Sequence, residues 1–305
     1  MAVANPERQS WEARVAELEA AKPSPVKEAF RRLWANKLAF FGAVVVLLYI
    51  VTAIVGPLVA PHDYADQVLA DARIPPATDS TYPLGTDQLG RDVLSRLLKA
   101  IQVSVGIGFG ITAIALVFGT MVGVIAGYYR GRIDTLLNGL TEMVWGFPLI
   151  LIAVIIIGAV GPGLKGVILA IAFISWAAFA RVARGEALAL REREFVQGAK
   201  ALGKSDLYII RKHILPNLLP AILVMTSFYV AFAIIAEAGL SFIGLGAQEP
   251  LPSLGQMVAD GRDLLLTNHW LSTIPGLTIV LLILALNALG DGLRDILDPR
   301  LRTER

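Results

Sequence analysis

Long apolar segments alternate with shorter polar segments along most of this chain. Six of the apolar segments reach about the 20 residues that a helix needs to cross a bilayer. They cover, approximately, residues 38–60, 101–127, 134–158, 164–182, 218–240 and 272–292. Lipid offers no partner for backbone N–H and C=O groups, so each segment must be helical. The pattern predicts an all-α integral membrane protein with six transmembrane helices.

Glycine and proline occur inside these segments. The clearest cases are Gly119, Gly123 and Gly127 in the second segment and Pro148 in the third. Both residue types are tolerated in membrane helices more than in soluble ones, so we expect the third segment to remain one span. Small residues allow neighbouring helices to approach closely. We therefore expect Gly106, Gly110, Ala113, Gly119 and Gly123 to lie at helix–helix contacts.

Composition supports a membrane protein and excludes several kinds of site. Of the 305 residues, 55% are hydrophobic and 17% are charged, whereas about a quarter of a soluble domain is charged. The absence of cysteine excludes disulfides, thiolate metal sites and a cysteine nucleophile. His62, His213 and His269 are far apart in the sequence, so we expect no metal site. The net charge of +2 gives no indication of a nucleic-acid partner, and we expect none.

The distribution of basic residues predicts the orientation of the chain. Of the 27 Lys and Arg residues, 21 lie in the polar segments that share a side with the N-terminus. Cytoplasmic segments carry an excess of these residues. We therefore expect both termini, and the charged segment 181–217, to lie in the cytoplasm.

Three regions follow from this topology. Residues 1–37 form a cytoplasmic tail, in which Val26–Lys37 suits an amphipathic helix at the inner membrane interface. Residues 38–100 form a retained first span and an external loop, and residues 101–305 form a five-span core. In the external loop, one helical face carries apolar residues from Leu89 to Leu98, with Thr86 or Asp87 as the expected cap.

The charged segment between the fourth and fifth spans carries two overlapping patterns. Gly198-Ala-Lys-Ala-Leu-Gly203-Lys204-Ser205 matches the phosphate-binding pattern G-x-x-x-x-G-K-[ST]. A nucleotide-binding loop of this kind follows a strand, whereas the residues before Gly198 favour helix. We therefore expect no nucleotide site here. We expect instead a short helix, a turn at Gly203 and a second helix, with Gly198 and Ala199 offering a flat surface to a partner.

The second pattern resembles the EAA loop of ABC importer permeases, which has the spacing Glu-Ala-Ala, three residues, Gly, nine residues, Ile-x-Leu-Pro. The corresponding residues here are Gln197, Gly198, Ala199, Gly203, His213, Leu215 and Pro216. Glu237–Gly246, Asn287–Leu301 and Leu84–Leu98 resemble other stretches of the same permeases. Together they identify the chain as similar to the C-type permease subunits of the dipeptide/oligopeptide/nickel importer family.

The resemblance implies a six-span, non-catalytic subunit in a bacterial inner membrane. The implied partners are a second permease, two ABC ATPases that bind the ATP and Mg²⁺, and an external peptide-binding protein. This chain would hold no cofactor. The residues expected to couple it to the ATPases, within a loop at about 183–217, are Gln197, Gly198, Ala199, Leu202, Gly203, Lys204, Ser205, Leu215 and Pro216.

Two carboxylates lie inside predicted spans, where ionisable residues are functional candidates. For Glu142 we favour a pair with Arg130 or Arg132 at the inner interface. Glu237 either lines the transport pathway or pairs within the bundle. Two further functions remain open: an importer permease for nickel or another small solute, and a stand-alone channel or secondary carrier. A membrane enzyme has no support, because no catalytic set of residues is found.

Overall fold

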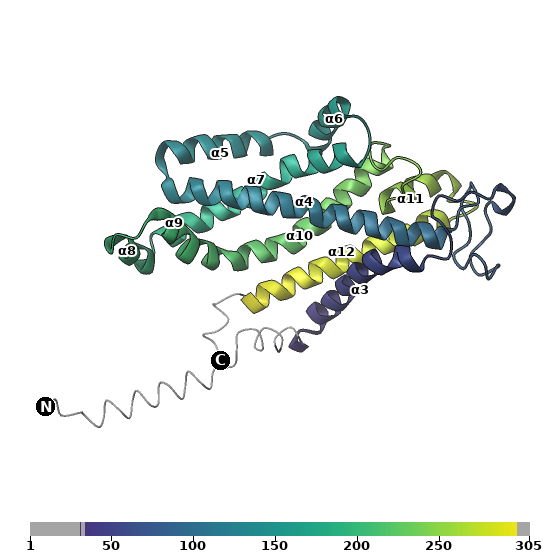
Figure 1. Ribbon diagram of the computed structural model, residues 1–305, viewed down its shortest axis with the longest axis horizontal. Helices are drawn as coiled ribbons and strands as arrows, with labels where there is room; N and C mark the ends of the chain where they lie inside the picture. The colour runs from purple at the N-terminus through teal and green to yellow at the C-terminus, as the bar shows by residue number, and fades with distance from the viewer. Residues whose placement is uncertain (1–30, 32–33, 298–305) are drawn as a thin grey trace, which may run out of the picture.

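The computed structural model describes Arg31 and residues 34–297, and the regular secondary structure of this part is helical, with no strand. The longer helices are α3 (Lys37–Val59), α4 (Val93–Tyr129), α5 (Gly131–Trp145), α6 (Leu149–Val160), α7 (Leu164–Arg191), α10 (Leu215–Phe242) and α12 (Trp270–Leu297). The shorter ones are α8 (Glu194–Ala201), α9 (Asp206–Ile209), a π-helical turn (Ile210–Ile214) and α11 (Leu254–Gly261). They form an elongated bundle with α8 and α9 at one end and residues 61–92 at the other (Figure 1). The interfacial helix expected near Val26–Lys37 lies mostly outside the described residues.

The expected membrane segments are present, and several helices are longer than the apolar stretch that marks them. Five helices are long and apolar enough to cross a membrane, and α5 with α6 forms a sixth candidate. Helix α4 begins at Val93, before the predicted start at 101, and α7 continues through Arg191, beyond the predicted end at 182. Hydropathy locates the part of a helix that suits lipid, whereas charged helix formers such as Arg and Glu extend the helix into water.

The prediction of one helix across residues 134–158 is wrong. Helices α5 and α6 meet at 90°, with the break between Trp145 and Leu149. Pro148 lacks an N–H and disfavours helical geometry at the preceding residue, Phe147. Pro57, Pro220 and Pro275 lie inside helices that continue, so proline alone does not fix the outcome. At the break, Gly146 precedes Phe147 and removes one more helix-favouring side chain.

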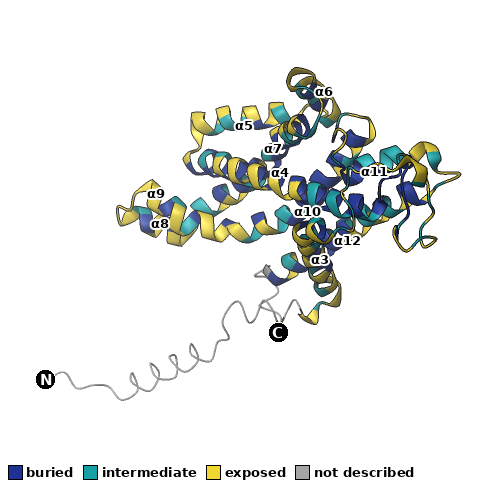
Figure 2. Cartoon of the chain, turned by 45° about the vertical axis from the view of Figure 1, so that its right-hand side comes forward, coloured by how far each residue is buried: buried dark blue, intermediate teal, exposed yellow. Residues whose placement is uncertain are grey.

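Helix α4 packs most extensively on α7, and its glycines make that contact possible. A Cβ atom at Gly119 would lie 2.2 Å from the carbonyl oxygen of Trp176, and one at Gly123 would lie 2.2 Å from that of Ala180. Both obstacles are backbone atoms, which cannot rotate away. The expectation of a helix contact is confirmed for Gly119 and Gly123 and is wrong for Gly106 and Gly110, which have nothing within 4 Å of their Cβ positions. The outward sides of the bundle remain apolar and exposed, as lipid or a partner subunit requires (Figure 2).

We expect Gly123→Val to destabilise the bundle by about 2–3 kcal/mol, since it forces α4 and α7 apart. Gly110→Val is the matched control, because it lies on the same helix with nothing within 4 Å of its Cβ position. Thermal unfolding of the purified variants in detergent measures the difference. Equal losses in both variants would mean that valine itself, and not the helix contact, is responsible.

The predicted cap of the helix in the external loop is wrong. Helix α4 begins at Val93, and Asp92 caps it by accepting hydrogen bonds from the backbone N–H groups of Leu94 (3.2 Å) and Ser95 (3.1 Å). The segment before Asp92 is not helical. Thr86 and Asp87 instead hold the loop together, because Thr86 contacts the backbone at Asp71 and Ile74.

Candidate functional site

The segment that joins α7 to α10 forms the expected helix, turn and second helix. Helix α8 ends at Ala201, and Ser205 caps α9 by accepting from the N–H of Tyr208 (3.4 Å). Between them, Gly203 has φ +70° and open space around its Cβ position. The left-handed backbone, and not lack of room, is what favours glycine there. The α8–α9 tip is the end of the bundle opposite the external loop (Figure 1).

The match to a phosphate-binding loop is limited to the sequence pattern and does not extend to the backbone conformation. Residues 198–201 lie in α8, and no strand precedes them in the described chain. The backbone N–H groups of Leu202, Gly203 and Lys204 donate to carbonyl oxygens of Gly198, Lys200 and Ala199. Groups that are used in this way cannot cradle a phosphate. The expectation that this segment is helical is confirmed.

Most of the predicted coupling residues are exposed at the α8–α9 tip, but one is not. Ala199 is buried together with Val196 on the inner face of α8, so the expectation that it offers a flat surface is wrong for this residue. The exposed members are Gln197, Gly198, Leu202, Gly203, Lys204 and Ser205 at the tip, and Leu215 and Pro216 at the start of α10. Leu207 was not foreseen, yet it is 73% exposed and lies close in sequence to Leu202, which is 80% exposed. Leu207 begins an apolar run that continues through Ile210, and the sequence does not show which of these residues is exposed.

Tyr128 connects the tip to the long helices, a role that no sequence pattern indicates. It is almost fully buried at the end of α4. Its hydroxyl donates to Asp206 at the start of α9 (2.7 Å), and its carbonyl oxygen accepts from Arg191 at the end of α7. The ammonium group of Lys200 in α8 lies 5.4 Å from its ring centre. Four helices therefore meet at one side chain.

Ion pairs join α5 and the turn before it to α7. Asp134 accepts two hydrogen bonds from Arg184, and Glu142 accepts one from Arg181 (3.0 Å). The predicted pairing of Glu142 with Arg130 or Arg132 is therefore wrong. Twelve helical residues separate Glu142 from Arg130, about 18 Å along an α-helix. Helix α7 is the element that offers Glu142 a cation.

The sequence left open whether Glu237 lines the transport pathway or bonds within the bundle, and its position favours the second alternative. It is fully buried in α10, and its carboxylate accepts hydrogen bonds from Ser241 (2.6 Å) and from Ser104 of α4 (3.4 Å). Ser104 also accepts from the backbone N–H of Leu254 at the start of α11 (3.0 Å). The carboxylate thus ties three helices together within the bundle. It is not exposed on any surface of this chain.

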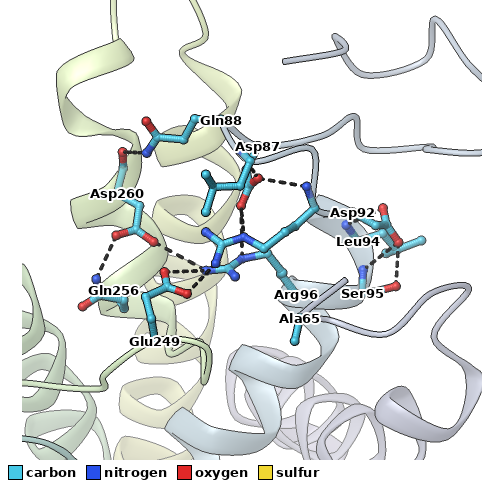
Figure 3. A network of polar contacts seen from close by, with 12 residues as sticks. Ala65, Asp87, Gln88, Asp92, Leu94, Ser95, Arg96, Glu249, Gln256 and Asp260 are labelled. Atoms are coloured by element: carbon cyan, nitrogen blue, oxygen red, sulfur yellow. Dashed lines mark hydrogen bonds and ion pairs between the residues drawn. The ribbon is translucent and has the colours of Figure 1, made fainter. Parts of the chain in front are cut away.

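An ionic network at the end of the bundle formed by residues 61–92 was also not foreseen (Figure 3). Arg91 donates to Asp87 (2.6 Å) and pairs with Glu249. Arg96 lies 3.6 Å from Asp87, 3.7 Å from Glu249 and 3.5 Å from Asp260. Both arginine side chains are almost fully buried. The network joins the start of α4 to α11 and to the loop before α11.

Burial and neighbouring charges shift the pKa values of the groups in this network in opposite directions. Burial lowers the pKa of Arg91, but the hydrogen bond to Glu249 and the charge of Asp87 outweigh it, so the pKa lies above its ordinary value. Burial raises the pKa of Asp260, and the charge of Arg96 offsets this only in part. Among the described residues, no group of three His, Cys, Asp or Glu side chains is placed to hold a metal ion.

Comparison with known proteins gives consistent matches over nearly the whole chain. Residues 119–303 match the family described as "Binding-protein-dependent transport system inner membrane component". Residues 24–76 match the "N-terminal TM domain of oligopeptide transport permease C". The dipeptide transport system permease protein DppC of Alkalihalophilus pseudofirmus is 39% identical over 92% of this chain and 91% of its own length.

Two further matches cover a different relative and a solved structure. The glutathione transport system permease protein GsiD of Pectobacterium atrosepticum is 36% identical over 92% of this chain and 93% of its own length. An inward-facing structure of the MetNI methionine ABC transporter superposes with a TM-score of 0.56 and 19% identity, over 66% of this chain and 96% of that one. At that identity the structural match supports the fold alone.

Proposed function

Since the chain belongs to the family of binding-protein-dependent transport system inner membrane components, we propose that it is a permease subunit of an ATP-driven importer of dipeptides or oligopeptides. The relatives named for dipeptide and glutathione transport support a peptide substrate. They do not favour nickel as the substrate, nor a stand-alone carrier. The subunit itself is non-catalytic in this proposal and binds no cofactor.

The observation that carries the proposal is the α8–α9 tip. Leu202 and Leu207 expose large apolar side chains beside Lys200, Lys204 and Asp206, in a segment too polar to lie in lipid. Exposed apolar side chains surrounded by polar ones mark a protein contact. In this family the partner at such a tip is the ATPase, which binds ATP and Mg²⁺. The tip is therefore proposed to lie in the cytoplasm, with both termini on the same side.

The proposed assembly contains a second permease, two ABC ATPases and an external peptide-binding protein. The two permeases and the two ATPases form the complex within and beneath the bilayer, and the binding protein delivers the peptide. The exposed apolar sides of the membrane helices serve the second permease and lipid. Transport then requires the two permeases to alternate between discrete arrangements.

Tyr128 supplies the route by which the ATPases act on the helices. ATP binding closes the ATPases and displaces the α8–α9 tip. Because Tyr128 bonds to Asp206 of α9 and contacts Arg191 of α7, the displacement reaches both α4 and α7. Helix α4 extends to the external network, so a tilt at its inner end also moves the outer end. The cavity between the permeases opens outward as a result.

Affinity purification in mild detergent, followed by mass spectrometry, tests the proposed partners. We expect the chain to recover a second permease and ATPases from native membranes. Leu207→Asp is expected to reduce ATPase recovery at least about tenfold and to retain the second permease, since a central interface residue contributes about 2 kcal/mol or more. Leu266→Asp is the matched control, because Leu266 is fully exposed at the external end. Recovery of the wild-type chain alone would refute the proposal.

A further inference from the structure

A half-exposed ion pair lies on the surface formed by α5 and α7. Glu142 of α5 and Arg181 of α7 are 3.0 Å apart, and their side chains are 54% and 44% exposed. The guanidinium carbon of Arg181 lies 3.9 Å from the ring centre of Trp145. Two opposite charges and an aromatic ring are thus presented together. The next pair along the two helices, Asp134 and Arg184, is bidentate and less exposed.

This surface is not suited to lipid, for two independent reasons. Charged side chains within membrane segments face the protein interior or a water-filled cavity, and Glu142 lies within the candidate span formed by α5 and α6. Arg181, at the boundary between the apolar and the charged part of α7, reaches it. The chain also breaks directly after Trp145, where α5 and α6 meet at 90°. Non-helical backbone at membrane depth is tolerated only where protein buries it or where it lines a water-filled cavity.

The charges on the surface match those of a peptide with free termini. Such a peptide carries an ammonium group, a carboxylate and apolar or polar side chains between them. Glu142 accepts from the ammonium, and Arg181 donates to the carboxylate with the planar geometry that guanidinium offers. Because Glu142 and Arg181 share a single hydrogen bond, the guanidinium has donors left for a ligand. Trp145 provides an apolar face beside them.

We propose that Glu142, Arg181 and Trp145 form a contact site for zwitterionic peptides on the wall of the transport pathway. The site rests on the proposed function, because it requires a water-filled pathway through which peptides pass. It adds to that function a role for this subunit in substrate recognition, in addition to the external binding protein. Asp134 and Arg184 form a structural tie between the same two helices and take no part in it.

The chain contains no cysteine, so a single introduced cysteine reports directly on this surface. Met143→Cys is suitable, because Met143 is exposed and next to Glu142. In the complex assembled with its partners, a water-soluble cationic methanethiosulfonate reagent is expected to label it. A peptide-loaded binding protein with a non-hydrolysable ATP analogue is expected to reduce the labelling rate about tenfold relative to unloaded binding protein. Leu284→Cys, exposed on α12, is the lipid-facing control and should remain unlabelled.

A second substitution separates peptide contact from simple accessibility. Adding Arg181→Gln to Met143→Cys is expected to remove most of the protection, because one charge-assisted contact contributes about a tenfold change in occupancy. Adding Asp134→Asn is expected to retain it. Failure of the reagent to label Met143→Cys in any state would mean that the second permease covers this surface, and would overturn the site. Labelling without protection, or protection that Arg181→Gln leaves unchanged, would also overturn it.

Peptide uptake by the wild-type complex distinguishes failure of this site from failure of the proposed function. If the wild-type complex does not import peptide, the proposed function itself is refuted. If it imports peptide but Met143→Cys is never protected, only the contact site is refuted.

Discussion

Gly203→Asp is expected to reduce ATP-driven peptide uptake at least about a hundredfold and to leave membrane insertion intact. Gly203 has φ +70° with open space around it, and aspartate tolerates this left-handed conformation better than most residues. The tip should therefore keep its shape. An unpaired charge placed in a protein interface costs several kcal/mol, and each 1.4 kcal/mol is a factor of ten. The loss falls on docking of the ATPases and not on folding.

Gly203→Asn is the matched control for this substitution. Asparagine has nearly the shape of aspartate, also tolerates the left-handed region and carries no charge. We expect it to retain much more uptake than Gly203→Asp at equal expression. Uptake in proteoliposomes and co-purified ATPase are the two measurements. Wild-type uptake by Gly203→Asp would show that the tip around Gly203 does not couple the helices to ATP.

Arg91→Met is expected to destabilise the packing of α4 on α11 by about 3–5 kcal/mol, the usual cost of removing one member of a buried ion pair. The substitution leaves the Asp87 carboxylate without its 2.6 Å hydrogen bond. Glu249 also loses a partner, but its side chain is half-exposed, so water can solvate its charge. The negative charge that remains buried near Asp87 and Asp260 accounts for most of the loss.

Thermal unfolding of the purified protein measures this effect, with Arg262→Met as the control. Arg262 lies directly after α11, is half-exposed and pairs with the exposed Asp263 (3.5 Å), so its loss should change stability by less than about 1 kcal/mol. A similar, small change in both variants would mean that the network around Arg91 and Arg96 does not hold α11 against α4.

The sequence predicts the architecture well because the bilayer imposes few solutions. Any segment of about 20 apolar residues must be a helix, so five of the six membrane segments follow from hydropathy. The helical segment around Gly203 follows from its helix-favouring residues. The spacing that ends in Leu215 and Pro216 added the family resemblance. Helix ends were less accurate, because α4 and α7 continue in polar sequence where hydropathy gives no signal.

The contacts that matter most for mechanism were not predictable from one sequence. Arg91 and Glu249 are separated by 158 residues, and Tyr128 and Asp206 by 78. Such pairs depend on how the helices pack, which local patterns do not encode. The same reason explains the wrong partner for Glu142. Its neighbours in sequence lie along its own helix, whereas Arg181 comes from a helix that packs beside it.

The wrong prediction of one continuous helix through Pro148 has a different cause. A membrane helix can continue through a proline or be interrupted by it. Helix α10 continues through Pro220, whereas the chain breaks at Pro148. The deciding factor is whether neighbouring groups satisfy the freed backbone. At Pro148 the preceding Gly146 and Phe147 leave the helix, and the interruption creates the surface on which Trp145 and Arg181 meet.

Peptide uptake into proteoliposomes tests the central claim most directly. The complex purified through this chain is reconstituted with a peptide-loaded binding protein, and labelled peptide is counted inside the vesicles with and without ATP. The account predicts uptake that requires ATP, the binding protein and an unmodified Gly203. Uptake that proceeds without ATP, or through this chain in the absence of any partner, would contradict it.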